Sequence, residues 1–314
     1  MFLRGSAGVL VAGGLLAGWL LVEAVLAQPP GPPRARMHTA TQSSGEPALV
    51  PATEAAPTTP QVSITVEGDQ RVIRANGIPN HAVGQFPNRG NPHEIRAQSY
   101  VLKVPARPRL AENTTPLGLQ DFGIAVNGVP FDPGAAEWFR GQRGSDWQYE
   151  ALSGAVALGL DANHAHVQPT GAYHYHGLPK TLFEQLGAKP GSHSPIVGWA
   201  ADGFPIYALY GYTERNDAES PIKVLKSSYR LKSGERPRMR LQPGGAFDGT
   251  FIADYEYVKG SGDLDECNGR VTRTPEYPNG IYAYFLTEAW PVIPRCYKGT
   301  PSKDFERKRR ARRR

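Results

Sequence analysis

The stretch Asp161-Ala-Asn-His-Ala-His-Val-Gln-Pro-Thr-Gly-Ala-Tyr-His-Tyr-His-Gly177 holds half of the eight histidines of this chain, as two His-x-His pairs. Alternate side chains of a strand point to the same face, so each pair can present two imidazoles on one side. Neutral imidazole is the commonest metal-binding side chain in proteins. The stretch therefore predicts two short strands that carry a cluster of metal-binding histidines.

Residues 168–172, between the two pairs, predict a tight hairpin. Pro169 suits the first central position of a type I turn, and Gly171 suits the left-handed position that follows. This three-residue loop places each histidine of one pair opposite a histidine of the other, and directly opposed residues share a face. A loop one residue longer or shorter would put the pairs on opposite faces. The opposed residues are His166 with His174 and His164 with His176.

A cluster of four imidazoles suits zinc or copper, and three with an open position suit a catalytic metal. His193, in a loop between Gly and Pro residues, is a further candidate ligand. Asp161 and Asp202 are candidates to orient a metal-bound imidazole from behind, although Asp202-Gly203 also predicts a turn. The alternative is that the histidines only pack in a polar core. The predicted ligands are His164, His166, His174, His176 and His193.

The rest of the chain predicts a mainly β protein. It contains 35 glycines and 29 prolines, which is typical of loop-rich β structure. Alternating apolar residues predict strands, and Asn127-Gly128 is a strong hairpin signal. Residues 181–186 predict a short helix. We expect a single β-sandwich-like or barrel-like domain over residues 61–300, with long loops and a few short helices. The predicted strands are 62–66, 71–75, 99–104, 122–126, 129–131, 206–210 and 282–286.

The N-terminal region predicts export. Residues 1–27 combine Arg4, an apolar run and small residues at the end, as in a signal peptide, and Glu23 favours cleavage. The alternative is an uncleaved helix that anchors the protein in a membrane. Residues 28–60 are rich in Pro, Ala, Thr and Ser, which predicts a disordered linker. We therefore expect a periplasmic or secreted protein.

The two cysteines, Cys267 and Cys296, fit an oxidising compartment and predict a disulfide. The alternative is a pair of free thiols that act as ligands. Cys267 lies within the acidic stretch Asp263-Leu-Asp-Glu-Cys-Asn-Gly269, whose oxygen atoms suit calcium. The stretch does not match an EF-hand loop, so a polar loop anchored by the disulfide is the simpler interpretation.

The net charge of +6 comes from the C-terminus. Residues 303–314 hold eight basic and two acidic residues, and the remaining chain has 27 of each. Residues 301–314 therefore predict a disordered basic tail, which could contact an anionic membrane or cell-wall polymer. No basic patch with interleaved aromatic residues occurs elsewhere, so the sequence does not predict nucleic-acid binding.

Four ordered blocks of sequence resemble the YHYH domain family. The first is the signature Tyr173-His-Tyr-His176 itself. The resemblance covers roughly residues 100–297 and implies an exported protein, but it implies no reaction. The three other blocks are residues 193–207, 264–271 and 274–285.

Three functions remain open at this point. The protein binds copper or zinc for storage, sensing or structure, or it is a metal-dependent hydrolase or oxidoreductase with a water on the metal. In the third possible function, no metal binds and the histidines only support a surface that binds a partner. A small-molecule or glycan ligand is also open, because tyrosines and tryptophans such as Tyr255 and Trp290 suit a sugar-binding face as well as core packing. Neither a Gly-x-Ser-x-Gly nucleophile motif nor a nucleotide-binding glycine motif occurs.

Overall fold

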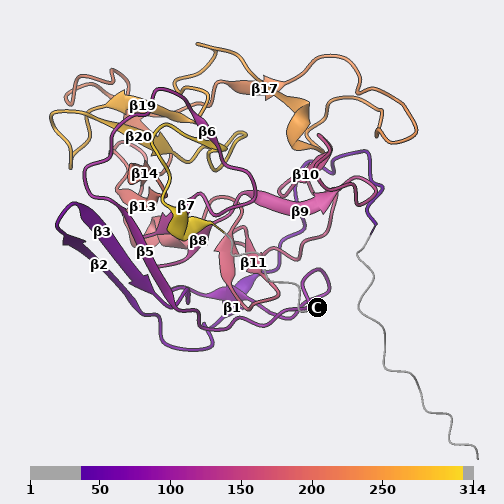
Figure 1. The fold of residues 1–314 in the computed structure, drawn as a ribbon, viewed down its shortest axis with the longest axis horizontal. Helices are drawn as coiled ribbons and strands as arrows, with labels where there is room; N and C mark the ends of the chain where they lie inside the picture. Colours follow the sequence, from indigo (N-terminus) through magenta and orange to yellow (C-terminus); the bar gives the residue numbers. More distant parts are fainter. Residues whose placement is uncertain (1–36, 307–314) are drawn as a thin grey trace, which may run out of the picture. The chain divides into compact units, whose positions relative to one another are not determined.

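The computed structural model describes residues 37–306. The predicted signal peptide, residues 1–27, and most of the predicted basic tail lie outside this range. Within the part of the chain that is described, no helix is both long and apolar enough to cross a bilayer. The predicted mainly β fold is confirmed, with long loops between short strands (Figure 1).

The largest sheet has eight strands in the order β11-β12-β8-β7-β13-β14-β20-β19. Two neighbouring pairs, β12 with β8 and β14 with β20, run parallel, and the other pairs are antiparallel. The histidine hairpin is one edge of this sheet and β19 is the other, so the described strands do not close a barrel. The bounds are β7 Gly123–Ala125, β8 Pro130–Phe131, β11 Ala165–Val167, β12 Tyr173–Tyr175, β13 Ile196–Ala200, β14 Pro205–Tyr207, β19 Gly269–Thr272 and β20 Ile281–Phe285.

A second sheet of three antiparallel strands supplies the other wall of the main core. It consists of β2 (Val62–Glu67), β3 (Gln70–Ala75) and β5 (Tyr100–Pro105). Along β5 the side chains of Leu102 and Val104 are buried while their neighbours are exposed, as the alternation in the sequence predicts. These side chains pack in one core cluster with residues of the large sheet. The two sheets therefore form a sandwich-like arrangement.

The remaining strands and helices are short and lie outside these two sheets. Helix α1 (Lys180–Gln185) forms where a helix is predicted and buries Leu182 and Phe183. The other strands are β1 Ala52–Glu54, β4 Val83–Gly84, β6 Thr115–Pro116, β9 Gly134–Trp138, β10 Gln148–Glu150, β15 Tyr210–Tyr212, β16 Ile222–Val224, β17 Tyr229–Leu231, β18 Tyr255–Tyr257 and β21 Cys296–Tyr297, and the 3-10 helices are η1 Ile252–Asp254 and η2 Lys303–Phe305.

Residues 37–60 differ from the disordered linker that their composition predicts. Strand β1 pairs with β4, and Val50 forms a bridge with Asp161 beside the histidine hairpin. The Tyr149 hydroxyl donates a hydrogen bond to the carbonyl of Ala40 at 2.8 Å. These contacts are mostly to backbone groups far away in sequence. The composition of residues 37–60 therefore cannot predict them.

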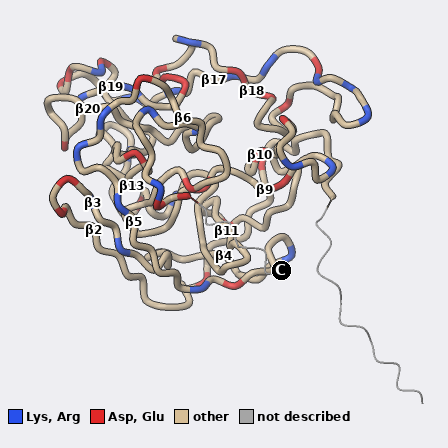
Figure 2. Tube along the Cα trace, in the orientation of Figure 1, with Lys and Arg blue, Asp and Glu red and all other residues tan. Residues whose placement is uncertain are grey.

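The start of the predicted tail is also packed. The Ser302 N–H donates to the carbonyl of Ala201 at 2.9 Å, and Phe305 in η2 is buried. Residues 307–314, which carry most of the basic charge, lie outside the described residues. Over the described chain, acidic and basic side chains are interspersed (Figure 2), as the balanced charge outside residues 303–314 predicts.

The disulfide between Cys267 and Cys296 is present, with their Cα atoms 5.0 Å apart. The acidic stretch beside it is a hydrogen-bonded loop. Asp265 accepts the N–H groups of Cys267 and Gly269 at 3.0 and 3.1 Å, and Lys298 pairs with Glu266 at 2.8 Å. Protein donors thus engage these carboxylates, which agrees with the polar-loop interpretation.

We predict that reducing this disulfide lowers the free energy of unfolding by about 3–4 kcal/mol, because the crosslink closes a loop of about 30 residues in the unfolded chain. Denaturant unfolding of the oxidised and reduced protein measures the difference. The Cys267→Ser, Cys296→Ser double variant is the control and should match the reduced protein. Equal midpoints for all three would contradict the prediction.

Candidate metal centre

The turn that sets the histidine register has the predicted form. The Gln168 N–H donates to the carbonyl of Ala172 at 2.9 Å, and the Gly171 N–H donates to that of Gln168 at 2.8 Å. Gly171 has a φ of 90°, and a Cβ there would lie 2.6 Å from the Cβ of Arg96. Glycine is therefore required both by the left-handed backbone and by the close approach of Arg96. With this turn, His166 lies opposite His174, as predicted.

Three imidazoles, those of His166, His174 and His176, converge on one point. The Nε2 atom of His176 lies 3.0 Å from the Nε2 of His174 and 3.0 Å from the Nε2 of His166. Nitrogen ligands of a tetrahedral zinc ion, at about 2.0–2.1 Å from the metal, lie about 3.3 Å apart. The two measured separations are therefore close to those that a metal ion would impose, and all three ligand atoms lie within 4.8 Å of one another.

Backbone carbonyls fix the orientation of two of these rings. The Nδ1 of His166 lies 2.8 Å from the carbonyl of Leu158, and the Nδ1 of His174 lies 3.1 Å from that of Ala172. A carbonyl only accepts, so each Nδ1 carries the proton and each neutral ring has its lone pair on Nε2. Burial, together with repulsion from His174 and His93, lowers the pKa of His166 to about 3. The His166 ring is therefore neutral at pH 7 and presents a lone pair to the centre.

A buried carboxylate that the sequence did not single out lies beside the three rings. The Oδ2 of Asp132 is 3.7 Å from the Nε2 of His174 and accepts a hydrogen bond from Gln168 at 3.2 Å. Asp132 follows β8 directly, and its N–H donates to the carbonyl of Tyr175 in the parallel neighbour β12 at 2.8 Å. The Asp132 side chain is only 3% exposed. A buried carboxylate at this place favours a cation between the three imidazoles.

His164 is not brought into the cluster, which corrects the predicted patch of four histidines. The residue has a φ of 51°, because the chain makes a turn in which the His164 N–H donates to the carbonyl of Asp161 at 2.8 Å. This turn ends the strand alternation one residue before β11. The His164 Nδ1 instead accepts the N–H of Leu178 at 3.2 Å.

The other predicted ligand and the two predicted supporting carboxylates have separate partners. The Nδ1 of His193 lies 2.8 Å from the carbonyl of Ser194, and its ring packs against Tyr207 and Tyr212. Asp202 accepts the Tyr284 hydroxyl at 2.6 Å and the Gly299 N–H at 2.9 Å. Among the described residues, only His166, His174 and His176 form a group with the spacing of a metal site.

The two tyrosines of the signature lie on the opposite face of β12, in the core, because they alternate with the histidines along the strand. The Tyr173 hydroxyl donates to Asp161 at 2.7 Å. The Tyr175 hydroxyl donates to the Nε2 of His81 at 2.6 Å and accepts from Asn127 at 2.9 Å. Burial raises the pKa of both hydroxyls. Asp161 thus supports the hairpin from the tyrosine side rather than orienting a histidine.

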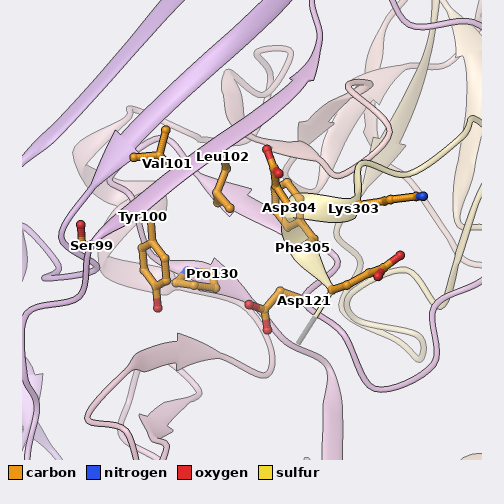
Figure 3. A pocket seen from close by; sticks show the side chains of 10 residues that line it. Ser99, Tyr100, Val101, Leu102, Asp121, Pro130, Lys303, Asp304 and Phe305 are labelled. Carbon is orange, nitrogen blue, oxygen red and sulfur yellow. The ribbon is translucent and has the colours of Figure 1, made fainter. Parts of the chain in front are cut away.

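One large cavity does not include any of the three histidines. It has a volume of about 730 Å³ and lies between β5 and η2 (Figure 3). Tyr100, Asp121 and Asp304 border it, while the Lys303 side chain extends away from Tyr100. The cavity also borders Glu306, the last described residue. None of the residues that border this cavity belongs to the histidine cluster, which remains the candidate site.

Comparison with known proteins bears on the same region. No curated protein and no solved structure matches the chain. A family model described as "YHYH protein" matches residues 101–299, which include the histidine hairpin, Asp132 and the disulfide. This match covers more than half of the chain and confirms the resemblance in the sequence, so the protein belongs to the YHYH family.

Proposed function

We propose that the protein binds one copper or zinc ion through the Nε2 atoms of His166, His174 and His176. The observation that carries the proposal is the convergence of these three atoms, two of which are held as lone-pair donors by carbonyls behind the rings. A hydrogen bond on the outer nitrogen is the usual way in which a protein orients a metal-bound imidazole.

Hydrogen bonding alone accounts poorly for the arrangement. The Nε2 of His176 lies 3.0 Å from two nitrogens that each carry a lone pair. A neutral His176 ring with a proton on Nε2 could donate a well-directed hydrogen bond to only one of them. At the other nitrogen, two lone pairs would then face each other, or one proton would be shared between two acceptors in poor geometry. A metal ion accepts all three lone pairs at once and supports this geometry without that conflict.

The fourth coordination position distinguishes two roles. Asp132, 3.7 Å from the Nε2 of His174, is near enough to supply an oxygen after a small movement, which would close the site for metal storage or structure. If water takes the position instead, the three-histidine set is that of a catalytic zinc or copper. The burial of His174 and His176, both 2% exposed, favours the closed site. X-ray absorption of the metal-loaded protein separates the two roles.

We also propose that the protein acts outside the cytoplasm. The support is the Cys267–Cys296 disulfide, because such bonds persist in oxidising compartments. Expression of the full chain in bacteria, followed by fractionation and sequencing of the N-terminus, tests this proposal. A protein recovered only from the cytoplasm with Met1 intact would contradict it.

We predict that His174→Ala lowers bound copper or zinc at least fivefold, because two imidazoles hold an ion far less tightly than three. Metal analysis after loading and dialysis measures the stoichiometry. His164→Ala is the matched control, since His164 belongs to the same hairpin but not to the cluster, and it should keep the wild-type metal content. Equal metal content in all three proteins would contradict the proposed site.

We predict that Asp132→Asn weakens metal affinity about 10–100-fold, which is typical for the loss of a carboxylate that supports a metal site. The amide has nearly the same shape and can still accept from Gln168, so the fold should persist. Competition with a chromophoric chelator measures the affinity. An unchanged affinity would show that the Asp132 charge does not act on the ion.

We predict that Tyr173→Phe retains the metal but lowers the free energy of unfolding by about 1–3 kcal/mol. The substitution leaves the buried Asp161 carboxylate without the hydroxyl that it accepts at 2.7 Å. Denaturant unfolding and metal analysis of the same sample test both parts. Loss of metal without loss of stability would contradict the prediction, because the Tyr173 hydroxyl would then contribute to metal binding and not only to packing.

A further inference from the structure

A second cavity, of about 370 Å³, lies next to the histidine hairpin but outside the metal cluster. Two aromatic rings, Tyr255 and Trp290, border it together with the imidazole of His164 and the charged groups of Lys180 and Glu288. The volume falls at the lower end of the range of about 300–1,000 Å³ that is typical of small-molecule sites.

The aromatic wall of this cavity is held rigidly from behind. The rings of Tyr255 and Trp290 stack with centroids 4.3 Å apart and planes within 5° of parallel. The Trp290 Nε1–H donates to Glu150 at 2.8 Å, and Glu150 in turn pairs with Arg295 at 2.6 Å. The side chain of Glu150 is only 4% exposed. Each ring covers one face of the other, so the stack can offer a ligand an outer ring face or the ring edges. An aromatic surface that is fixed before the ligand arrives loses little conformational entropy on binding.

His164 also borders this cavity and carries a hydrogen-bond donor. Its Nδ1 accepts the N–H of Leu178, so the neutral ring carries its proton on Nε2. The left-handed φ of 51° places the ring at this cavity rather than with His166 and His176. A non-glycine residue in this backbone region is uncommon and strained. The turn that removes His164 from the metal cluster thus supplies this cavity with a polar group.

The rim of the cavity is more acidic than basic. Glu46 and Glu288 are exposed there, and Lys180 is the exposed cation among the residues that border it. Glu150 and Asp248 also border the cavity, but arginines pair with both. The charge of the rim disfavours an anionic ligand and tolerates a neutral or cationic one.

We infer that this cavity binds one or two units of a neutral or amino sugar. A pyranose ring has an apolar face of C–H groups and a rim of hydroxyls. An outer ring face of the Tyr255–Trp290 stack matches the apolar face, and His164, Lys180 and the acidic rim match the hydroxyls. The inference is independent of the proposed metal ion, because none of the three clustered histidines borders the cavity.

Calorimetric titration of the full chain with trisaccharides tests the inference. The probes are maltotriose, the trisaccharide of N-acetylglucosamine, its deacetylated form and, as the anionic member, trigalacturonate. We expect at least one neutral or amino trisaccharide to bind with a Kd in the millimolar range or tighter, and trigalacturonate not to bind. Failure of every probe to bind, or binding of trigalacturonate alone, would overturn the inference.

A pair of leucine variants locates the binding. Leu49 borders the cavity and is 37% exposed, so Leu49→Trp should fill the cavity without emptying the core. Leu110→Trp is the matched control on an exposed leucine that does not border it, 53% exposed. We expect Leu49→Trp to weaken binding at least tenfold at an unchanged melting temperature, and Leu110→Trp to bind as the wild type does. Equal affinities in the two variants would overturn the inference.

His164→Ala separates the sugar site from the metal site in one sample. We expect it to weaken trisaccharide binding severalfold while the bound metal stays at the wild-type level. A loss of metal with unchanged sugar affinity would contradict the placement of His164 at the cavity.

Discussion

The arrangement of this site depends on the three-residue turn between β11 and β12. The side-chain period of a strand is two, so a slip of one residue would move His166 to the face opposite His174. The left-handed Gly171, which Arg96 covers at a distance that excludes a Cβ, prevents such a slip. Its backbone carbonyl also accepts the N–H of Arg96 at 2.9 Å, so the turn is attached to a neighbouring segment as well as closed on itself. A constraint on a single backbone position thus sets where the histidines lie.

The same alternation divides the signature into two halves with different physical roles. Tyr173 and Tyr175 are fully buried on the core face, and each finds a partner for its hydroxyl, which is what burial of a polar group requires. On the other face, backbone carbonyls lie behind the rings of His166 and His174, and the three imidazoles face one another. Because the tyrosine contacts hold the strand in place, the imidazoles need not find their positions on their own, and binding of the proposed ion would cost little entropy.

The sequence predicted what is local and missed what is not. The hairpin, its register and the burial of its tyrosines follow from residues within one turn of one another. His164 departs from the prediction because an Asp161 turn overrides the pleat just before β11. Asp132 could not be found, since it reaches the histidines only through the parallel pairing of β8 with β12, strands that are more than 40 residues apart. His81, the partner of Tyr175, was missed for the same reason.

The electrostatics of the centre explain why Asp132 matters to any ion held there. Three neutral imidazoles leave the full charge of a bound cation uncompensated, and burial of an uncompensated charge is expensive. With His174 and Asp132 each almost fully buried, water can supply little of that compensation. The carboxylate reduces the net charge of the occupied site by one. In the absence of an ion, the same carboxylate is itself a buried anion that contacts Gln168 and the His174 ring. Ion and carboxylate therefore each lower the desolvation cost of the other, a coupling that the histidines alone would lack.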